Sequence, residues 1–352
     1  MLLRAMRPPG GLGLECPRVT ATSAPVFVGG CPRSGTTLVR TMLNSHPELA
    51  VPHETLFLVN AYRSRGRWGD LSEAGNRRRL AKWVVRRKKS RAGRLTPDPD
   101  ELVARMVAAP GTLGSVVGAG FRLYADRHDK PRWGDKRPSY ALNLDAVFAM
   151  FPDAQYVNIV RDPRAAVASI RKISEQPGRV GWYEDGLVAG TDLWERSQKE
   201  AERWKGRLRP EQFHEIQYEQ LLEDPAAVLE GIVGFLALDP AGIEPMLTFH
   251  QTVDIKGGNI HPLVAKPLTT ETVRKWEQEL TREEIALVER ELGERMVRYG
   301  YEPVASGVAI PSDLERRLRH RKRFMRRKLA RRWLGEQKLR LTYRHSVAAV
   351  NS

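Results

Sequence analysis

Short apolar runs alternate with amphipathic segments through most of the chain. Residues 25–30 and 155–160 are compact, mainly apolar stretches, typical of strands that are buried on both faces of a sheet. Each is followed by a segment with the apolar spacing of a helix, at residues 36–44 and 164–172. Pro163, preceded by an aspartate, is favourable chemistry for starting the second helix. Strands that alternate with helices predict an α/β fold, with a parallel, P-loop-like sheet that has helices on both faces.

The apolar pattern also sets the expected extent of the domain. Further strands are expected at residues 48–51 and 213–217, and further helices at residues 192–208, 225–236 and 281–298. Residues 25–303 should therefore form one domain, with a basic helical insertion at about residues 61–100. Residues 1–24, which Pro and Gly interrupt, are expected to be a disordered N-terminus, and residues 304–352 a linker followed by a basic amphipathic tail.

Two segments account for the positive charge of the chain, which totals +16. Residues 63–94 and residues 314–340 each contain thirteen Lys or Arg and two acidic residues, so each has a net charge of +11 and the rest of the chain about −6. The main domain is thus not basic, and no nucleic-acid partner is expected. Each basic segment is either a solvated helical face or a contact for an anionic partner, such as a membrane surface, an acidic substrate or RNA.

The tail has apolar positions at helical spacing: Leu314, Leu318, Met325, Leu329 and Trp333. Residues 314–334 are therefore expected to form a helix with one apolar stripe among Arg and Lys. Such a helix suits peripheral contact with an anionic membrane. The alternative is that the stripe packs on the domain or on a second subunit, as in a homodimer.

Cysteine content and hydropathy bear on the compartment. The two cysteines, Cys16 and Cys31, are too few for a disulfide framework, which favours a reducing compartment. The first 25 residues lack the apolar run of a signal peptide, and no later stretch approaches the ~20 apolar residues that span a bilayer. A cytoplasmic protein is expected, with peripheral membrane contact as an option.

A glycine-rich segment, GCPRSGTT at residues 30–37, joins the first expected strand to its helix. Backbone N–H groups and the helix dipole bind anions in this setting. The spacing from Gly30 to Gly35 matches the nucleotide-triphosphatase loop, but Thr36 stands where that motif has lysine, and Arg33 supplies the cation instead. No predicted strand ends in the acidic residue that usually helps to hold Mg²⁺, so metal-independent binding is expected. A glycine-rich turn without a ligand is the alternative.

Ordered motifs resemble those of one enzyme family. They lie at residues 28–47, 51–55, 134–138, 159–169, 218–221, 265–267 and 300–303. Together they resemble the sulfotransferases that use 3′-phosphoadenosine 5′-phosphosulfate (PAPS), and within these the branch that contains the tyrosylprotein sulfotransferases. The first and third of these, at residues 28–47 and 134–138, are specific motifs, whereas the others are weak alone and persuasive in sequence.

The resemblance implies roles on the donor side. Arg33 matches the basic residue that binds the 5′-phosphosulfate. The family residues that surround the same group match Ser34, Gly35, Thr36 and Thr37. Arg161 and Ser169 match the pair that binds the 3′-phosphate, and Tyr218 and Lys266 match further donor contacts. A cation beside a helix start is also what a 3′-phosphate requires chemically, although spacing alone does not establish that Ser169 reaches it.

The resemblance also implies the catalytic groups. Glu54 matches the general base, and Lys136 matches the lysine that neutralises charge on the bridging oxygen and the sulfuryl group. An acceptor hydroxyl needs such a base because its pKa is near 10 for a phenol and higher for an alcohol.

Each assignment has a structural alternative. Arg161 and Asp162 can be simply an ion pair at a helix start. Lys136 has basic neighbours (Lys130, Arg132 and Arg137) and can be a surface charge. His53 lies beside Glu54 and is the other candidate base.

Two departures from the family pattern concern the acceptor. Leu56 stands where peptide-tyrosine sulfotransferases have an arginine that grips an acidic peptide, and Val253, with Thr252 the nearest hydroxyl, stands where they have a serine. An acidic peptide is therefore disfavoured, while lipid, glycan, natural product and phenol all remain open. The expected reaction transfers a sulfuryl group from PAPS to an acceptor hydroxyl and leaves 3′-phosphoadenosine 5′-phosphate. The rival interpretations are a P-loop kinase-like phosphotransferase and a non-catalytic basic binding module.

Overall fold

The computed structural model describes residues 23–176, 185–251, 268–271 and 273–350. The strands are β1 (Val26–Gly30), β2 (Leu49–Ala50), β3 (Arg132–Lys136), β4 (Gln155–Val160) and β5 (Phe213–Gln217). The α-helices are α1 (Thr36–Ser45), α2 (Leu58–Arg63), α3 (Ala74–Arg86), α4 (Pro99–Ala108), α5 (Leu113–Asp126), α6 (Leu144–Met150), α7 (Pro163–Ser174), α8 (Gly186–Lys205), α9 (Tyr218–Glu223), α10 (Pro225–Leu236), α11 (Ile243–Leu247), α12 (Trp276–Glu279), α13 (Arg282–Arg298) and α14 (Ser312–Thr342). Short 3₁₀ helices include η2 (Arg65–Arg67), η3 (Lys88–Ser90), η4 (Ala92–Arg94) and η5 (Pro138–Leu142).

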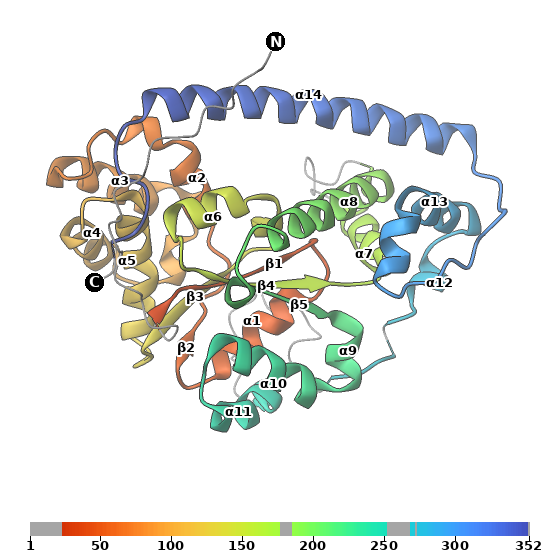
Figure 1. The fold of residues 1–352 in the computed structure, drawn as a ribbon, viewed down its shortest axis with the longest axis horizontal. Helices are drawn as coiled ribbons and strands as arrows, with labels where there is room; N and C mark the ends of the chain where they lie inside the picture. Colours follow the sequence, from red (N-terminus) through yellow and green to blue (C-terminus); the bar gives the residue numbers. More distant parts are fainter. Residues whose placement is uncertain (1–22, 177–184, 252–267, 272, 351–352) are drawn as a thin grey trace, which may run out of the picture.

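The described strands form one parallel five-stranded sheet in the order β2-β3-β1-β4-β5. Helices cover both of its faces: α1 and α9–α11 lie on one side, and α2, α5, α6 and α8 on the other (Figure 1). The predicted α/β architecture is confirmed. Because strand order reverses on either side of β1, the carboxyl end of β1 is the position where sheets of this kind bind ligands.

Strand β3 was not among the predicted strands. Its five residues, RWGDK, include three charged side chains, yet all five residues are buried. Arg132 is accommodated because it donates hydrogen bonds to the carbonyl oxygens of Ala24 and Leu236, at 2.6 Å each, and to the side chain of Gln155. The alternative interpretation of Lys136 as a surface charge is therefore wrong, because Lys136 is 4% exposed.

The basic tail forms α14, which runs along one edge of the molecule (Figure 1). Leu314, Leu318 and Met325 of the predicted apolar stripe are buried, while Leu329 and Trp333 are exposed. The first part of the stripe thus packs on the body, as the alternative interpretation held. No helix in the described parts of the chain is both long and apolar enough to cross a bilayer.

A buried ionic network joins α7 to the C-terminal part of the domain. The Arg164 guanidinium contacts the Asp162 carboxylate at 2.8 Å and the Glu289 carboxylate at 2.7 Å, and donates to the carbonyl oxygen of Glu302. Glu289 also accepts hydrogen bonds from the backbone N–H groups of residues 304 and 305. Since the charged side chains are nearly excluded from solvent, each compensates the desolvation of the others.

Replacing Arg164 with alanine should lower the free energy of unfolding by about 3–5 kcal/mol, because two buried carboxylates lose their cation. Urea denaturation provides the measurement. Arg203→Ala, which breaks the exposed Arg203–Glu200 pair, is the matched control and should cost less than about 1 kcal/mol. Equal losses in the two variants would contradict a structural role for the network.

Candidate active site

The sequence-predicted site residues that the structure describes lie at or near the carboxyl edge of the sheet. The loop at residues 31–35 follows β1, Lys136 ends β3, Arg161 follows β4, and Tyr218 follows β5. Glu54 lies in the loop between β2 and α2. Parallel register brings these ends together, since Val28 pairs with Lys136 on one side and Gly30 with Ile159 on the other. Lys266 lies outside the described residues.

The loop after β1 has a backbone that few residues adopt. Arg33 and Gly35 both have positive φ, at 73° and 92°. A Cβ atom at Gly35 would collide with the ring of Tyr218, so glycine is required for this approach. The turn brings the backbone to the start of α1, where unpaired N–H groups and the positive end of the helix dipole favour an anion.

Three predicted donor-side residues meet around this loop. Arg33 Nε donates a hydrogen bond to Ser169 Oγ at 3.0 Å, which places Ser169 beside the loop although it lies well along α7. Arg161 Nη1 donates to the carbonyl oxygen of Arg33 at 2.9 Å, and its guanidinium lies 4.5 Å from the centre of the Tyr218 ring. The alternative interpretation, an ion pair between Arg161 and Asp162, does not hold, because Asp162 pairs with Arg164 instead.

Two polar atoms at this loop are buried without a hydrogen-bond partner among the described residues: Ser34 Oγ and Arg161 Nε. Unsatisfied buried polar groups are costly, so they mark places where a ligand completes the hydrogen bonding. A hydroxyl, a guanidinium and a helix start together suit an anionic ligand such as a phosphate or a sulfate ester.

A carboxylate and a lysine meet next to the loop. Lys136 Nζ lies 3.7 Å from Glu54 Oε2 and donates a hydrogen bond to Thr37 Oγ1 at 3.4 Å. Glu54 is partly exposed, whereas Lys136 is nearly buried. The backbone carbonyl of Glu54 accepts a hydrogen bond from Arg94 at 2.6 Å. A solvent-accessible carboxylate therefore stands beside a cation that also touches the anion-binding loop.

Comparison with known proteins decides the family. The sequence model described as "Sulfotransferase family" matches residues 25–241. This chain belongs to the sulfotransferase family.

Individual relatives and solved structures agree with this assignment. Protein-tyrosine sulfotransferase A of Caenorhabditis elegans is 27% identical over 296 residues, which cover 81% of this chain and 69% of that protein. Nodulation protein NoeE of Sinorhizobium fredii is 28% identical over 294 residues, covering 78% of this chain and 65% of that protein. The sulfotransferase domain of the Synechococcus PCC 7002 olefin synthase superposes with a TM-score of 0.56 at 22% identity, over 80% of this chain and 96% of that domain.

Burial shifts the basicity of two groups beside Glu54. Burial lowers the pKa of Lys136, and the Arg40 and Arg94 charges lower it further, while Glu54 opposes them. Burial likewise lowers the pKa of His53 to about 4, with Arg40, Arg94 and Lys136 contributing. His53 is therefore neutral near pH 7 in this sulfotransferase, so its imidazole is no stronger a base than an ordinary carboxylate.

The sequence did not reveal the role of Asp135, which ties β3 to the loop that carries Glu54. Its carboxylate accepts hydrogen bonds from Thr55 Oγ1, at 3.3 Å, and from the Tyr140 hydroxyl in η5. Because successive side chains of a strand point to opposite faces, Asp135 contacts Thr55 and Tyr140 from one face of β3, and Lys136 contacts Glu54 from the other. The alternation would have predicted this arrangement, had residues 132–136 been identified as a strand.

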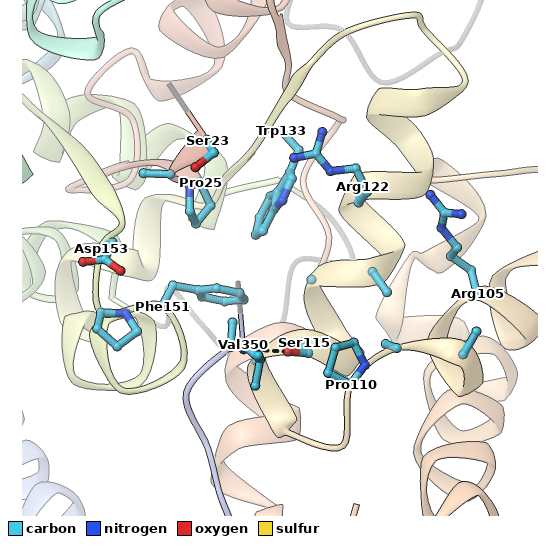
Figure 2. A pocket seen from close by; sticks show the side chains of 18 residues that line it. Ser23, Pro25, Arg105, Pro110, Ser115, Arg122, Trp133, Phe151, Asp153 and Val350 are labelled. Atoms are coloured by element: carbon cyan, nitrogen blue, oxygen red, sulfur yellow. Dashed lines mark hydrogen bonds between the residues drawn. The ribbon is translucent and has the colours of Figure 1, made fainter. Parts of the chain in front are cut away.

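A separate cavity of about 330 Å³ lies at the opposite, amino-terminal edge of the sheet (Figure 2). Pro25, Trp133 and Phe151 line it, with Arg105 and Arg122 at one side. None of the sequence-predicted site residues lines this cavity, so we do not assign the chemistry to it.

Burial raises the pKa of Asp135 to about 7 from 3.8, despite the opposing hydrogen bond from Tyr140. Between about pH 4 and pH 7 the unfolded chain therefore loses a proton that the folded protein keeps. Relative to Asp135→Asn, the wild-type free energy of unfolding should fall as pH rises through this window and stay level above it. Urea denaturation at a series of pH values measures the difference.

Tyr140→Phe is the matched variant, because it removes a hydrogen bond that lowers the pKa of Asp135. In this variant the titration of Asp135 should move to higher pH. If the difference in free energy of unfolding between the wild type and Asp135→Asn stays constant from pH 4 to pH 7, Asp135 ionises as an exposed carboxyl does.

Proposed function

We propose that this sulfotransferase transfers the sulfuryl group of PAPS to an acceptor hydroxyl, with Glu54 as general base and without a metal. The observation that carries the proposal is the line from Glu54 through Lys136 to Thr37, with separations of 3.7 Å and 3.4 Å. It sets a proton acceptor, a cation and an anion-binding loop side by side, which is the set that sulfuryl transfer to a hydroxyl needs.

The donor-side residues fit the two anionic groups of PAPS. The loop at residues 31–35, with Arg33, Ser34 and Gly35, and the first turn of α1, with Thr36 and Thr37, would hold the 5′-phosphosulfate. Arg161 and Ser169 would hold the 3′-phosphate, with Tyr218 beside them and Lys266 as a further contact. Ser34 Oγ and Arg161 Nε support this assignment, because neither atom has a hydrogen-bond partner among the residues that the structure describes.

PAPS supplies an activated sulfuryl group whose S–O bond to the nucleotide breaks as the bond to the acceptor oxygen forms. Glu54 would take the acceptor proton, since its carboxylate is partly exposed and anchored by the Arg94 hydrogen bond to its backbone. Lys136 and Arg33 would offset the charge that develops on the sulfuryl and bridging oxygens. A sulfuryl group carries less charge than a terminal phosphoryl, which is why protein cations can replace Mg²⁺.

The compartment that we propose is the cytoplasm. A reducing environment suits a chain with two cysteines, of which Cys31 is buried as a free thiol.

The deciding experiment incubates the protein and an extract of small molecules, lipids and glycans with ³⁵S-labelled PAPS, in the presence of EDTA. Label transferred to an acceptor supports the proposal, and the labelled species identifies the acceptor. Phosphate transfer from ATP that EDTA abolishes would favour a kinase, and absence of any transfer together with absence of PAPS binding would favour a binding module.

Glu54→Gln should lower turnover about 10²- to 10⁴-fold, the usual worth of a positioned general base. PAPS affinity should hardly change, because the carboxylate faces the acceptor side. Steady-state rates and donor titration measure the two effects. His53→Gln is the control and should retain most of the activity; if it abolishes turnover while Glu54→Gln does not, the base is misassigned.

Arg161→Ala should weaken binding of 3′-phosphoadenosine 5′-phosphate by roughly 1.5–3 kcal/mol, the worth of a charge-assisted hydrogen bond to phosphate. Adenosine 5′-phosphosulfate, which lacks the 3′-phosphate, should bind the wild type and the variant equally. Isothermal calorimetry measures both ligands. Equal losses for both would mean that Arg161 acts by supporting the loop through its hydrogen bond to Arg33.

A further inference from the structure

The two faces of α14 differ in their contacts: one packs on the domain, and the other faces solvent. On the inward face, Leu314, Leu318 and Met325 are buried. Ion pairs add to this attachment: Arg317 with Asp185 at 2.6 Å, and Lys322 with Glu291 at 2.6 Å. Further along, Glu336 pairs with Arg65 of η2 at 2.6 Å, a side chain that is 3% exposed. The helix is therefore fastened to the domain along most of its length.

The outward face forms a cationic ridge: Arg316, Arg319, Arg323, Arg326, Arg327 and Arg331, all of them exposed. These positions recur every three or four residues, so they align on one side of the helix. Apart from Arg319, which pairs with Glu315 at 3.3 Å, none of the six has a carboxylate partner within the described part of the chain. The acidic residues of α14 are Asp313 and Glu315 in its first turn and Glu336 near its end, so no carboxylate within residues 316–335 of the helix offsets the ridge.

Bulky apolar side chains accompany the ridge: Phe324, Trp333, Leu334 and Leu341 are 52%, 60%, 61% and 74% exposed. Leu334 and Leu341 continue the stripe of the ridge at helical spacing, and Trp333 and Phe324 flank it. Such residues are costly in water unless a partner covers them. They are also concentrated on the helix that carries the cations: among the exposed large apolar side chains that the structure describes, only Val297, Val304 and Val350 lie outside α14.

We propose that α14 docks this protein on an anionic lipid bilayer through its cationic ridge, with Trp333, Leu334 and Leu341 entering the headgroup region. Lipid phosphates satisfy the unpaired guanidinium groups, and the interface accepts tryptophan and leucine side chains. A helix of 31 residues, roughly 46 Å long, lies along the edge of the molecule and offers a line of contact to a flat surface (Figure 1). The phosphates of a nucleic acid would satisfy the arginines but would leave exposed leucines uncovered, so the bilayer is the better match.

This docking differs from the one that the apolar stripe predicted. Leu314, Leu318 and Met325 face the domain and are unavailable to lipid, so the helix does not need to leave the body in order to bind. The contact rests on charge together with a few apolar side chains, and therefore it should weaken as salt concentration rises.

The test is co-sedimentation of the full chain with vesicles of phosphatidylcholine, with and without phosphatidylglycerol, at low salt. The wild type should sediment with the vesicles that contain phosphatidylglycerol and not with those of phosphatidylcholine only. The ridge variant Arg323→Glu, Arg326→Glu and Arg327→Glu should bind at least about tenfold more weakly, since each basic residue near the surface contributes about 1 kcal/mol. Trp333→Ser with Leu334→Ser should also bind more weakly, and the wild-type tryptophan emission should shift to shorter wavelength on binding.

The matched control makes the same change of charge elsewhere, at exposed positions of α3: Arg78→Glu, Lys82→Glu and Arg86→Glu. It should bind the vesicles within about twofold of the wild type, and thermal unfolding checks that both triple variants are folded. Failure of the wild type to sediment with anionic vesicles, or equal loss in both triple variants, would overturn the proposal. It would also be overturned if RNA bound through the same ridge more tightly than vesicles and without dependence on Trp333 and Leu334.

Discussion

The ion pair between Lys136 and Glu54 is the interaction on which the carboxyl edge of the sheet depends. Lys136 is nearly buried, and a buried ammonium group is stable only when a negative charge and hydrogen-bond acceptors lie close to it. Glu54 supplies the negative charge from the loop between β2 and α2, and Thr37 supplies the acceptor from the first turn of α1. The same contact that makes the burial of Lys136 tolerable therefore fixes the distance between the carboxylate and the anion-binding loop.

The loop that carries Glu54 is itself held by the basic insertion. Arg94 donates to the carbonyl oxygen of Glu54, and the backbone N–H of Leu56 donates to the carbonyl oxygen of Ser90. Thr55, which lies between Glu54 and Leu56, donates a hydrogen bond to the Asp135 carboxylate of β3. The basic insertion thus contributes Ser90 and Arg94 to the support of the Glu54 loop. This support matters for the proposed base, because a displacement of about 1 Å is costly to a reaction.

Local patterns gave reliable predictions where local chemistry determines the structure. The strand at residues 155–160 and the helix at residues 225–236 have the predicted bounds, because apolar periodicity and helix-start residues define them. Strand β3 was not predicted because Arg132, Asp135 and Lys136 are charged, and, apart from Tyr140, the groups that satisfy them lie far away in sequence. Likewise, the sequence placed Arg161 beside Asp162 but could not show that the carboxylate is taken by Arg164, whose other partner, Glu289, is 125 residues away. Residues that act through distant partners need the tertiary structure.

The proposed donor and acceptor sides of the site are built differently. On the donor side, Arg33, Arg161 and Tyr218 come within three residues of the ends of β1, β4 and β5, so the register of the sheet fixes them. On the acceptor side, Glu54 depends on a loop that contacts the insertion through Arg94 and Ser90. Changes in the insertion can alter what approaches Glu54 without moving a strand. The sheet register alone therefore does not determine the acceptor, which has to be found by experiment.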